Sequence, residues 1–140
     1  MRNNYTYAEV SWILNNYNTL RCGVMPDHIP AELGTRLPVS TQARFTFCCE
    51  MAAQVYIRVR KCGRDGLIVK VVYGMGEERP KPDRVLSREW HISLSEIWRT
   101  VNKVKWYCVG EDDNPLSYED WKKMKPYRKK RTFVRGGQAA

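Results

Sequence analysis

Polar and basic side chains recur at helical spacing in the stretch 87–106, SREWHISLSEIWRTVNKVKW. Such side chains hydrogen-bond the base edges and phosphates of double-stranded DNA, and the first turn of a helix that carries them enters the major groove in helix-turn-helix proteins. The spacing places one set on the outer face of a helix: Ser95, Glu96, Arg99, Thr100, Asn102 and Lys103. The chemistry that this set favours is DNA recognition. A face that is only solvated has a similar composition, so both interpretations stay open.

Two short helices with a tight turn between them would position this set. Asp83 can cap a helix that ends near Trp90. Ser93 and Glu96 then form a capping box, in which the serine hydroxyl accepts from one free backbone N–H and the glutamate carboxylate accepts from another. A new helix therefore begins at Leu94, and the first helix does not run on.

The second helix has an apolar face with the spacing of buried helices. We expect this face to comprise Leu94, Ile97, Trp98, Val101, Val104, the stem of Lys105, and Cys108. With residues 91–93 as a three-residue turn, the segment from about 83 to 109 is predicted to be a helix-turn-helix. The alternative is a pair of packed helices without a DNA role, which is common in all-α proteins.

The first 40 residues favour a helix followed by a proline-bearing loop. Thr6 and Glu9 form another capping box, which predicts a helix over about 7–18. Its apolar positions are Val10, Ile13, Leu14 and Tyr17. Three prolines and two glycines within 22–40 exclude a long regular element there. We expect this loop to pack against the body in places.

The segment 41–62 is predicted to be the long central helix, because it contains no Gly or Pro and Gly63 follows it. Its apolar face comprises Phe45, Cys48, Cys49, Ala52, Val55, Tyr56 and Val59. The polar residues that fall elsewhere are Arg44, Glu50, Gln54, Arg58 and Lys61. Residues 64–74 fit a buried strand or a short helix, and their helical neighbours favour helix.

The sequence therefore predicts an all-α protein, with a compact helical domain over 1–110 and an acidic linker and basic tail over 111–140. The formal net charge is +9, and eight of the 24 Lys and Arg residues lie within 122–135, where no acidic residue occurs. They are Lys122, Lys123, Lys125, Arg128, Lys129, Lys130, Arg131 and Arg135. Such clustering favours contact with a polyanion such as RNA; a solubilising extension is the alternative.

Cysteine usage favours a reduced, cytoplasmic protein. The five cysteines are Cys22, Cys48, Cys49, Cys62 and Cys108. Their number is odd, no C-x-x-C spacing occurs and no secretory signal precedes them, so a disulfide framework is not expected. With only two histidines and no ligand spacing, we expect buried thiols and no metal site. No apolar run approaches the roughly 18 residues of a membrane span, so we expect no membrane partner.

Common catalytic motifs are missing from the chain. It has no phosphate-binding glycine loop, no H-E-x-x-H and no G-x-S-x-G, and GMGEERP at 74–80 lacks the third glycine of a dinucleotide fingerprint. The acidic run 111–113 fits neutralisation of the basic tail better than metal binding. We therefore expect neither enzyme activity nor a cofactor.

The order of these features resembles the antitermination protein Q family of lambdoid phages, especially its small members and the related AlpA-like bacterial antiterminator. The likeness covers about residues 10–110. It comprises a first helix with Trp12, a proline-containing loop, ARFTFCCE at the start of a helix that ends in basic residues, then DGLIVKVVYGMG, and finally a helix-turn-helix like that of sigma-factor region 4. The Cys-Cys-acidic step and VVYGMG are its most specific parts.

This resemblance implies a transcription antitermination factor. Such a protein binds a DNA element beside a promoter, engages paused RNA polymerase with its sigma factor, and modifies the RNA exit channel so that terminator hairpins do not form. If the DNA-binding role of the family is carried over to this chain, the residues that would read bases are Ser95, Glu96, Arg99 and Thr100. Phosphate contacts fall to Ser93, Asn102 and Lys103. The proline loop and the basic segments, Lys122 to Arg131 among them, become candidates for contact with polymerase and nascent RNA.

Two other functions share the same motif. A small terminase-like protein uses it to hold DNA in a ring during phage packaging, and a helix-turn-helix activator uses it to raise initiation. Sequence alone leaves these alternatives open.

Overall fold

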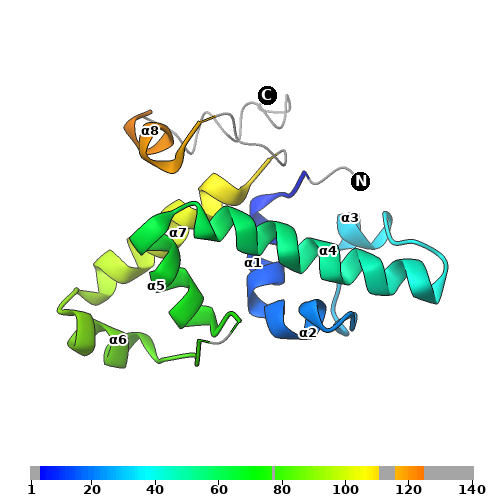
Figure 1. Ribbon diagram of the computed structural model, residues 1–140, viewed down its shortest axis with the longest axis horizontal. Coiled ribbons are helices and arrows are strands. Elements are labelled where there is room, and N and C mark those ends of the chain that lie inside the picture. The colour runs from blue at the N-terminus through cyan, green and yellow to red at the C-terminus, as the bar shows by residue number, and fades with distance from the viewer. Residues whose placement is uncertain (1–3, 77, 111–115, 125–140) are drawn as a thin grey trace.

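The computed structural model describes residues 4–76, 78–110 and 116–124, and its regular elements in these ranges are helices. They are α1 (Tyr7–Asn15), α2 (Tyr17–Arg21), α3 (Ala31–Gly34), α4 (Thr41–Arg60), α5 (Gly63–Tyr73), α6 (Asp83–Trp90), α7 (Leu94–Cys108) and α8 (Tyr118–Lys123). An isolated antiparallel bridge pairs Tyr5 with Gly110. Figure 1 shows α4 along the length of the molecule, with α1 crossing it and α8 near the end of α7. The prediction of an all-α fold is confirmed.

The first predicted helix is two helices. Thr6 Oγ1 accepts from the N–H of Glu9, and the Glu9 carboxylate accepts from the N–H of Thr6, both at 3.0 Å, so the capping box is confirmed. The helix then stops at Asn16, whose side-chain amide donates to the carbonyl of Trp12 at 2.9 Å. This local side-chain bond competes with the helical ladder. The chain restarts as α2, which packs along α4, and the predicted apolar positions of both pieces are buried.

The proline loop between α2 and α4 is bonded to α1, which confirms the prediction that this loop packs against the body in places. Arg36 pairs with the buried carboxylate of Glu9 at 2.8 Å, and the indole of Trp12 donates to the carbonyl of His28. The loop also contains α3, a short helix that the proline content obscured, and Leu33 of α3 is fully buried.

The central helix α4 has 20 residues and begins at a cap, in which Ser40 accepts from the N–H of Ala43 at 3.1 Å. Its buried residues are Phe47, Cys48, Met51, Ala52, Val55, Arg58 and Val59. The burial of Phe47 and Met51 was not predicted, and two predicted positions are wrong. Phe45 is 49% exposed because the start of α4 extends beyond the neighbouring helices, as Figure 1 shows. Arg58 was expected outside the core and is 5% exposed.

Arg58 is buried because its charge has partners. Its guanidinium donates to the carbonyl of Cys108 at 2.7 Å and lies 5.2 Å from the ring centroid of Tyr5. A charged hydrogen bond to a main-chain oxygen offsets much of the cost of removing an arginine from water. Arg58 thereby connects α4, the N-terminal segment and the end of α7.

Residues 64–73 are helical and Gly74 is the left-handed C-cap, which resolves the choice between strand and helix. Gly63 was expected only to follow the central helix, and it is also the first residue of α5. It turns the chain between the two helices with a φ of 58°. α5 then leaves α4 at very close range: a β-carbon on Gly66 would overlap the carbonyl oxygen of Val59. Only glycine permits this approach of two backbones.

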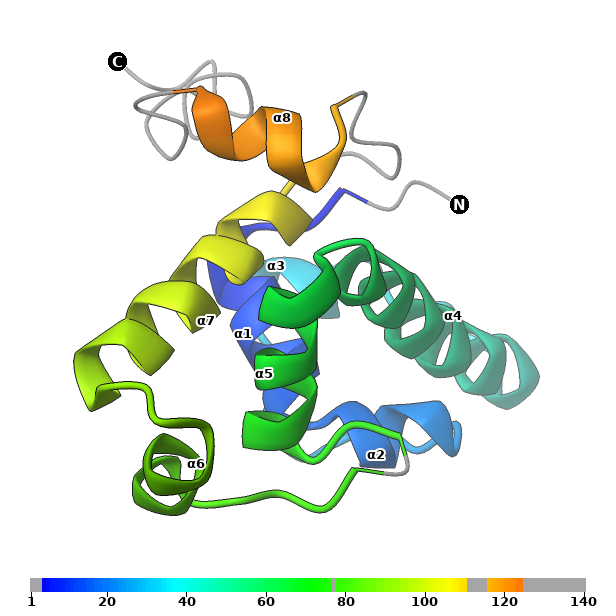
Figure 2. The same cartoon turned by 60° about the vertical axis from the view of Figure 1, so that its left-hand side comes forward.

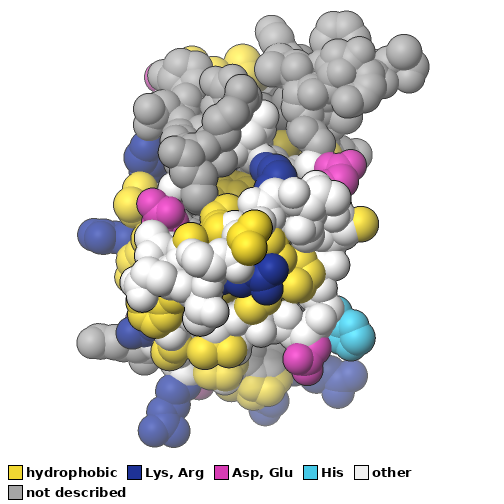
Figure 3. All heavy atoms as spheres, turned by 90° about the vertical axis from the view of Figure 1, so that its right-hand side faces the viewer, with side chains coloured by type: hydrophobic (Ala, Val, Ile, Leu, Met, Phe, Trp, Pro, Cys, Tyr) yellow, Lys and Arg dark blue, Asp and Glu magenta, His cyan; other side chains and the backbone are white. Residues whose placement is uncertain are grey.

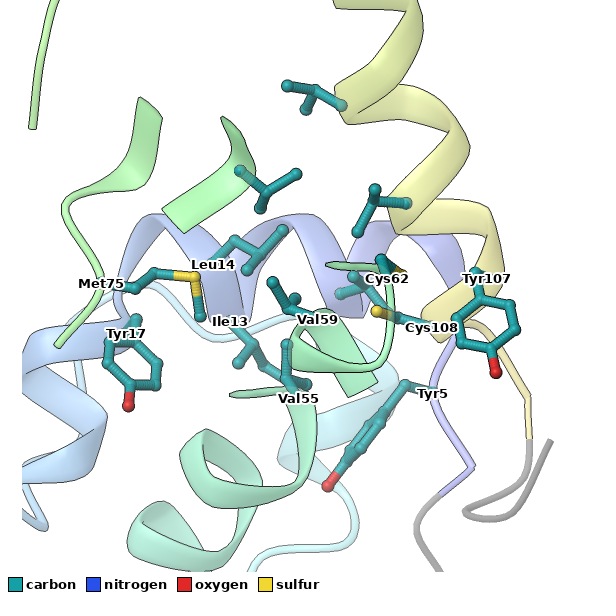
Figure 4. Packing of buried hydrophobic residues seen from close by; sticks show 14 of the residues in the cluster. Tyr5, Ile13, Leu14, Tyr17, Val55, Val59, Cys62, Met75, Tyr107 and Cys108 are labelled. Atoms are coloured by element: carbon teal, nitrogen blue, oxygen red, sulfur yellow. The ribbon is translucent and has the colours of Figure 1, made fainter. Parts of the chain in front are cut away.

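The core lies where α1, α4, α5 and α7 meet. Figure 4 shows Ile13 and Leu14 of α1 facing Val55 and Val59 of α4, with Met75 on one side. All five side chains are at most 1% exposed. Interdigitation of branched side chains from several helices is the main source of stability in such a domain.

The predicted tail segment includes a helix that joins the core. Tyr118 and Trp121 of α8 are buried, and both rings contact Tyr107 of α7 edge to face, with centroids 5.2 and 5.3 Å away. Tyr107 also donates to the carbonyl of Leu116 at 2.8 Å. The charge pattern of 111–140 did not predict this docking. The available signal was Trp121, a large aromatic side chain among acidic and basic residues.

The five cysteines are free thiols. Cys48, Cys62 and Cys108 are buried, Cys49 is partly exposed and Cys22 is exposed. Burial raises the pKa of the Cys62 thiol far above its ordinary value, and the neighbouring Cys108 adds to the effect. Burial likewise raises the pKa of Cys48.

Candidate nucleic-acid interface

The helices α6 and α7 are joined by three residues, at the boundaries that the sequence predicted. Pro82 occupies the N-cap of α6, so Asp83 is its first residue and not its cap. α6 ends because His91 adopts the left-handed conformation, with φ 54° and ψ 46°. Ser93 Oγ then accepts from the N–H of Glu96 at 3.2 Å, which caps the start of α7 and confirms the serine half of the predicted capping box. The carboxylate of Glu96 does not complete the box and pairs with Arg99.

Hydrogen bonds hold the turn and the crossing of the two helices. Ser87 of α6 donates its hydroxyl to the carbonyl of Ile92, and its own carbonyl accepts from the N–H of Ile92 at 3.1 Å. The indole N–H of Trp98 donates to the carboxylate of Asp83 at 2.8 Å. Leu86 of α6 is fully buried at this crossing. Together these contacts define the direction in which α7 leaves α6, shown in Figure 2.

The buried stripe of α7 is rotated from the predicted one. It comprises Ile97, Thr100, Val101, Val104, Tyr107 and Cys108, because α7 packs against α5 and α1 as well as α6. Thr100 is 6% exposed, so its predicted place on the outer face is wrong and it is not available to a base edge. Leu94 and Trp98 were predicted to be buried, and they are 40% and 39% exposed.

The other predicted contact residues lie on or near the outer face of α7. Ser93, Ser95, Glu96, Arg99 and Asn102 are exposed, and Lys103 is partly exposed. Arg99 and Glu96 form an ion pair at 2.9 Å in which the arginine side chain keeps 67% of its surface in solvent. An exposed pair of this kind is worth little to stability, so the guanidinium can exchange its partner. Asn102 accepts from the hydroxyl of Tyr7 at 2.9 Å, which holds its amide in place.

The neighbouring helix α6 carries further exposed basic side chains. Arg84 and Arg88 on α6 are exposed and one helical turn apart, and the sequence reasoning missed both. Their i, i+4 spacing on a helix was the available signal. Together α6 and α7 carry five Lys and Arg side chains against three Asp and Glu. The first turn of α7 adds free backbone N–H groups and the positive end of the helix dipole, both of which attract phosphate.

The basic tail divides between described and undescribed residues. Lys122 and Lys123 lie on α8, where Lys122 pairs with Glu119 at 3.2 Å and lies 4.8 Å from the ring centroid of Tyr118. Lys123 is 4.0 Å from Asp120. The remaining predicted contact residues lie outside the described residues: Lys125, Arg128, Lys129, Lys130 and Arg131.

The described residues lack two further kinds of feature. None of their helices is both long and apolar enough to cross a membrane. They contain no group of three or more His, Cys, Asp or Glu side chains placed to hold a metal ion.

Comparison of the chain with known protein families, with curated proteins and with solved structures found no match.

Proposed function

We propose that this protein is a DNA-binding transcription antitermination factor that contacts duplex DNA through a helix-turn-helix formed by α6 and α7. The observation that carries the proposal is the capped first turn of α7, which is exposed directly after a three-residue turn and bears Ser95, Glu96 and Arg99. A recognition helix requires this combination of a fixed helix start and outward hydrogen-bonding groups.

Within this proposal, the roles follow from side-chain chemistry. The guanidinium of Arg99 matches the two acceptors of guanine in the major groove, and Glu96 matches the amino group of cytosine. Arg84, Arg88 and Lys103 supply charge for the phosphates on either side. Leu94 and Trp98 offer apolar surface at the margin of the same face, suited to a thymine methyl group or a sugar.

The antitermination part of the proposal is supported by the order of features that resembles the lambdoid Q family. It assigns RNA polymerase, its sigma factor and the nascent RNA as partners. The net charge of +9 and the basic cluster of 122–135 are consistent with a protein that works beside a transcript.

Transcription in vitro through an intrinsic terminator tests the proposal. A duplex that binds the protein is first selected from a random pool and then placed beside the promoter. We expect terminator readthrough to rise with the wild-type protein only when this element is present, and not with Arg99→Ala. Equal readthrough on templates with and without the element would contradict the proposal. Increased initiation without readthrough would favour a helix-turn-helix activator.

A second candidate is a small terminase-like assembly protein, favoured by exposed apolar side chains near the start of α4. Val24, Val39 and Phe45 are 54%, 96% and 49% exposed. Figure 3 looks at this end of the molecule and shows hydrophobic side chains gathered on it. Light scattering after size exclusion separates the two functions. A stable ring of many subunits supports the assembly protein, and a monomer or dimer supports the factor that acts on polymerase.

A further inference from the structure

A second concave site lies on the other side of α5 from α6. Its volume is about 390 Å³, and it is lined by Tyr17, Arg21, Tyr56, Lys70, Gly76 and Glu78. These residues come from α2, α4, α5 and the turn after α5, a turn that Asn18 holds by donating to the carbonyl of Gly74 at 2.7 Å. Figures 1 and 2 both show α2 and α6 on opposite sides of α5, so this cleft is separate from the candidate DNA-contacting face.

A pair of tyrosine rings at this cleft has two cations beside it, Lys70 and Arg60, and Arg21 adds a third positive charge to the lining. The rings of Tyr17 and Tyr56 are stacked, with centroids 5.7 Å apart and planes 24° from parallel. The ammonium group of Lys70 lies 5.2 Å from the Tyr56 centroid, and the guanidinium of Arg60 lies 5.9 Å from it. Among the ion pairs of the described residues, none engages Lys70, Arg60 or Arg21. These charges are therefore available to an anion.

The hydrogen-bonding groups of the cleft add chemical detail. Burial raises the pKa of Tyr17, although the nearby Arg21 opposes the shift, so its hydroxyl stays protonated and can donate. Glu78 contributes the carboxylate of the lining. A carboxylate repels phosphate, yet it accepts from the 2′-hydroxyl that distinguishes ribose from deoxyribose.

We propose that the cleft between α2, α4 and α5 holds one nucleotide of a single-stranded RNA. Lys70 and Arg21 contact the phosphate, the Tyr17–Tyr56 pair provides the aromatic wall, and Glu78 faces the ribose. Cations interleaved with aromatic rings are the combination by which proteins hold single strands. The cleft is open, so it suits a strand that passes across it better than a free small molecule, which protein pockets normally enclose. The choice of RNA as the polyanion rests partly on the proposed function, whereas the arrangement of charges and rings does not.

Binding of a 5′-fluorescein-labelled dodecauridylate RNA to the full chain, followed by fluorescence anisotropy at several salt concentrations, tests this proposal. Loss of one phosphate contact from a single strand lowers the slope of log K against log salt by about 0.7, which is about fivefold in affinity at 0.1 M salt. We expect this change for Lys70→Gln and for Arg21→Gln. The matched control is Lys61→Gln, which removes the same charge from an exposed position that does not line the cleft. Equal losses in all three variants would overturn the proposal, because they would report general electrostatics alone.

The position of crosslinks and the preference for ribose over deoxyribose are two further measurements. Binding to the basic tail would not reproduce either result. In photocrosslinking with a 4-thiouridine RNA, we expect adducts on peptides that contain Tyr17 or Tyr56. Adducts confined to 122–135 would contradict the site. We also expect tighter binding of oligouridylate than of deoxyoligouridylate, with the preference reduced by Glu78→Gln. If uridine monophosphate competed as well as the dodecamer, the cleft would be a site for a free nucleotide. That result would overturn the proposal that it holds part of a strand.

The duplex DNA affinity of the same variants separates this proposal from the proposed function. Lys70→Gln should leave affinity for the selected duplex unchanged while RNA binding falls. If the protein bound RNA normally but recognised no duplex, the proposed function would be contradicted. The proposal that the cleft holds RNA would still be supported.

Discussion

The indole N–H of Trp98 donates to the carboxylate of Asp83 at 2.8 Å, which joins the first residue of α6 to the second turn of α7. The bond lies at the surface, since Trp98 is 39% exposed. It therefore braces the angle between the two helices from outside, while Leu86 and Ile97 pack within. Under the proposed function, this angle decides whether α7 reaches the major groove.

A double-mutant cycle on Asp83 and Trp98 measures this brace. Asp83→Ala and Trp98→Phe each remove the hydrogen bond, and we expect a coupling free energy of about 1 kcal/mol because one partner is charged and both are accessible to water. Urea unfolding of the two single variants and the double variant provides the number. Strict additivity of the two losses would show that the contact does not stabilise the crossing.

Arg99→Ala should weaken binding to the selected duplex by about 1–3 kcal/mol, the usual contribution of a bidentate contact with guanine. The fold should survive, because within the described part of the chain the ion pair of Arg99 is an exposed one with Glu96. Competition with random duplex is the measurement, and Lys61→Ala is the control for lost charge. The recognition-helix assignment fails if both variants lose affinity for specific and random DNA alike.

Gly66→Ala should destabilise the fold by at least about 2 kcal/mol, because the new methyl group meets the main-chain carbonyl of Val59 and a backbone yields little. Gly34→Ala is the matched control. It lies in α3 with no atom within 4 Å of the added carbon, so we expect no loss of stability and up to about 1 kcal/mol of gain. Urea midpoints that shift equally in both variants would contradict the close crossing of α4 and α5.

Thiol reactivity should separate Cys22 from Cys62. Cys22 is exposed, whereas burial raises the pKa of Cys62, so at pH 8 the Cys62 thiol stays protonated and unreactive in the folded state. Because the folded-state pKa is raised, this thiol also stabilises the fold below its ordinary pKa near 9, and that contribution is lost as the pH rises above it. Iodoacetamide labelling and mass spectrometry should show rapid modification of Cys22 and protection of Cys62 until denaturant is added. Equal labelling rates without denaturant would show that the core opens readily.

Local signals predicted the starts and ends of most helices. Thr6 forms both hydrogen bonds of its predicted capping box, and Ser93 forms the serine half of its own, because a cap depends on residues three positions apart and little else. α6 begins without a side-chain cap, because Pro82 and not Asp83 occupies its N-cap position. The left-handed turn at His91 was not predictable, since that conformation favours glycine over other residues.

Tertiary structure decided which face of each helix became the core. Arg58 is inside because the carbonyl of Cys108, 50 residues away, meets its charge, whereas Phe45 is half outside because α4 extends beyond its neighbours. Thr100 and Trp98 exchanged their predicted places because α7 packs against α1, α4, α5 and α6. The sequence by itself determined that the chain forms helices and where several of them begin. Only the packing of distant segments decided what α7 presents to solvent, because helical periodicity defines the stripes of a helix but not the direction from which its neighbours approach.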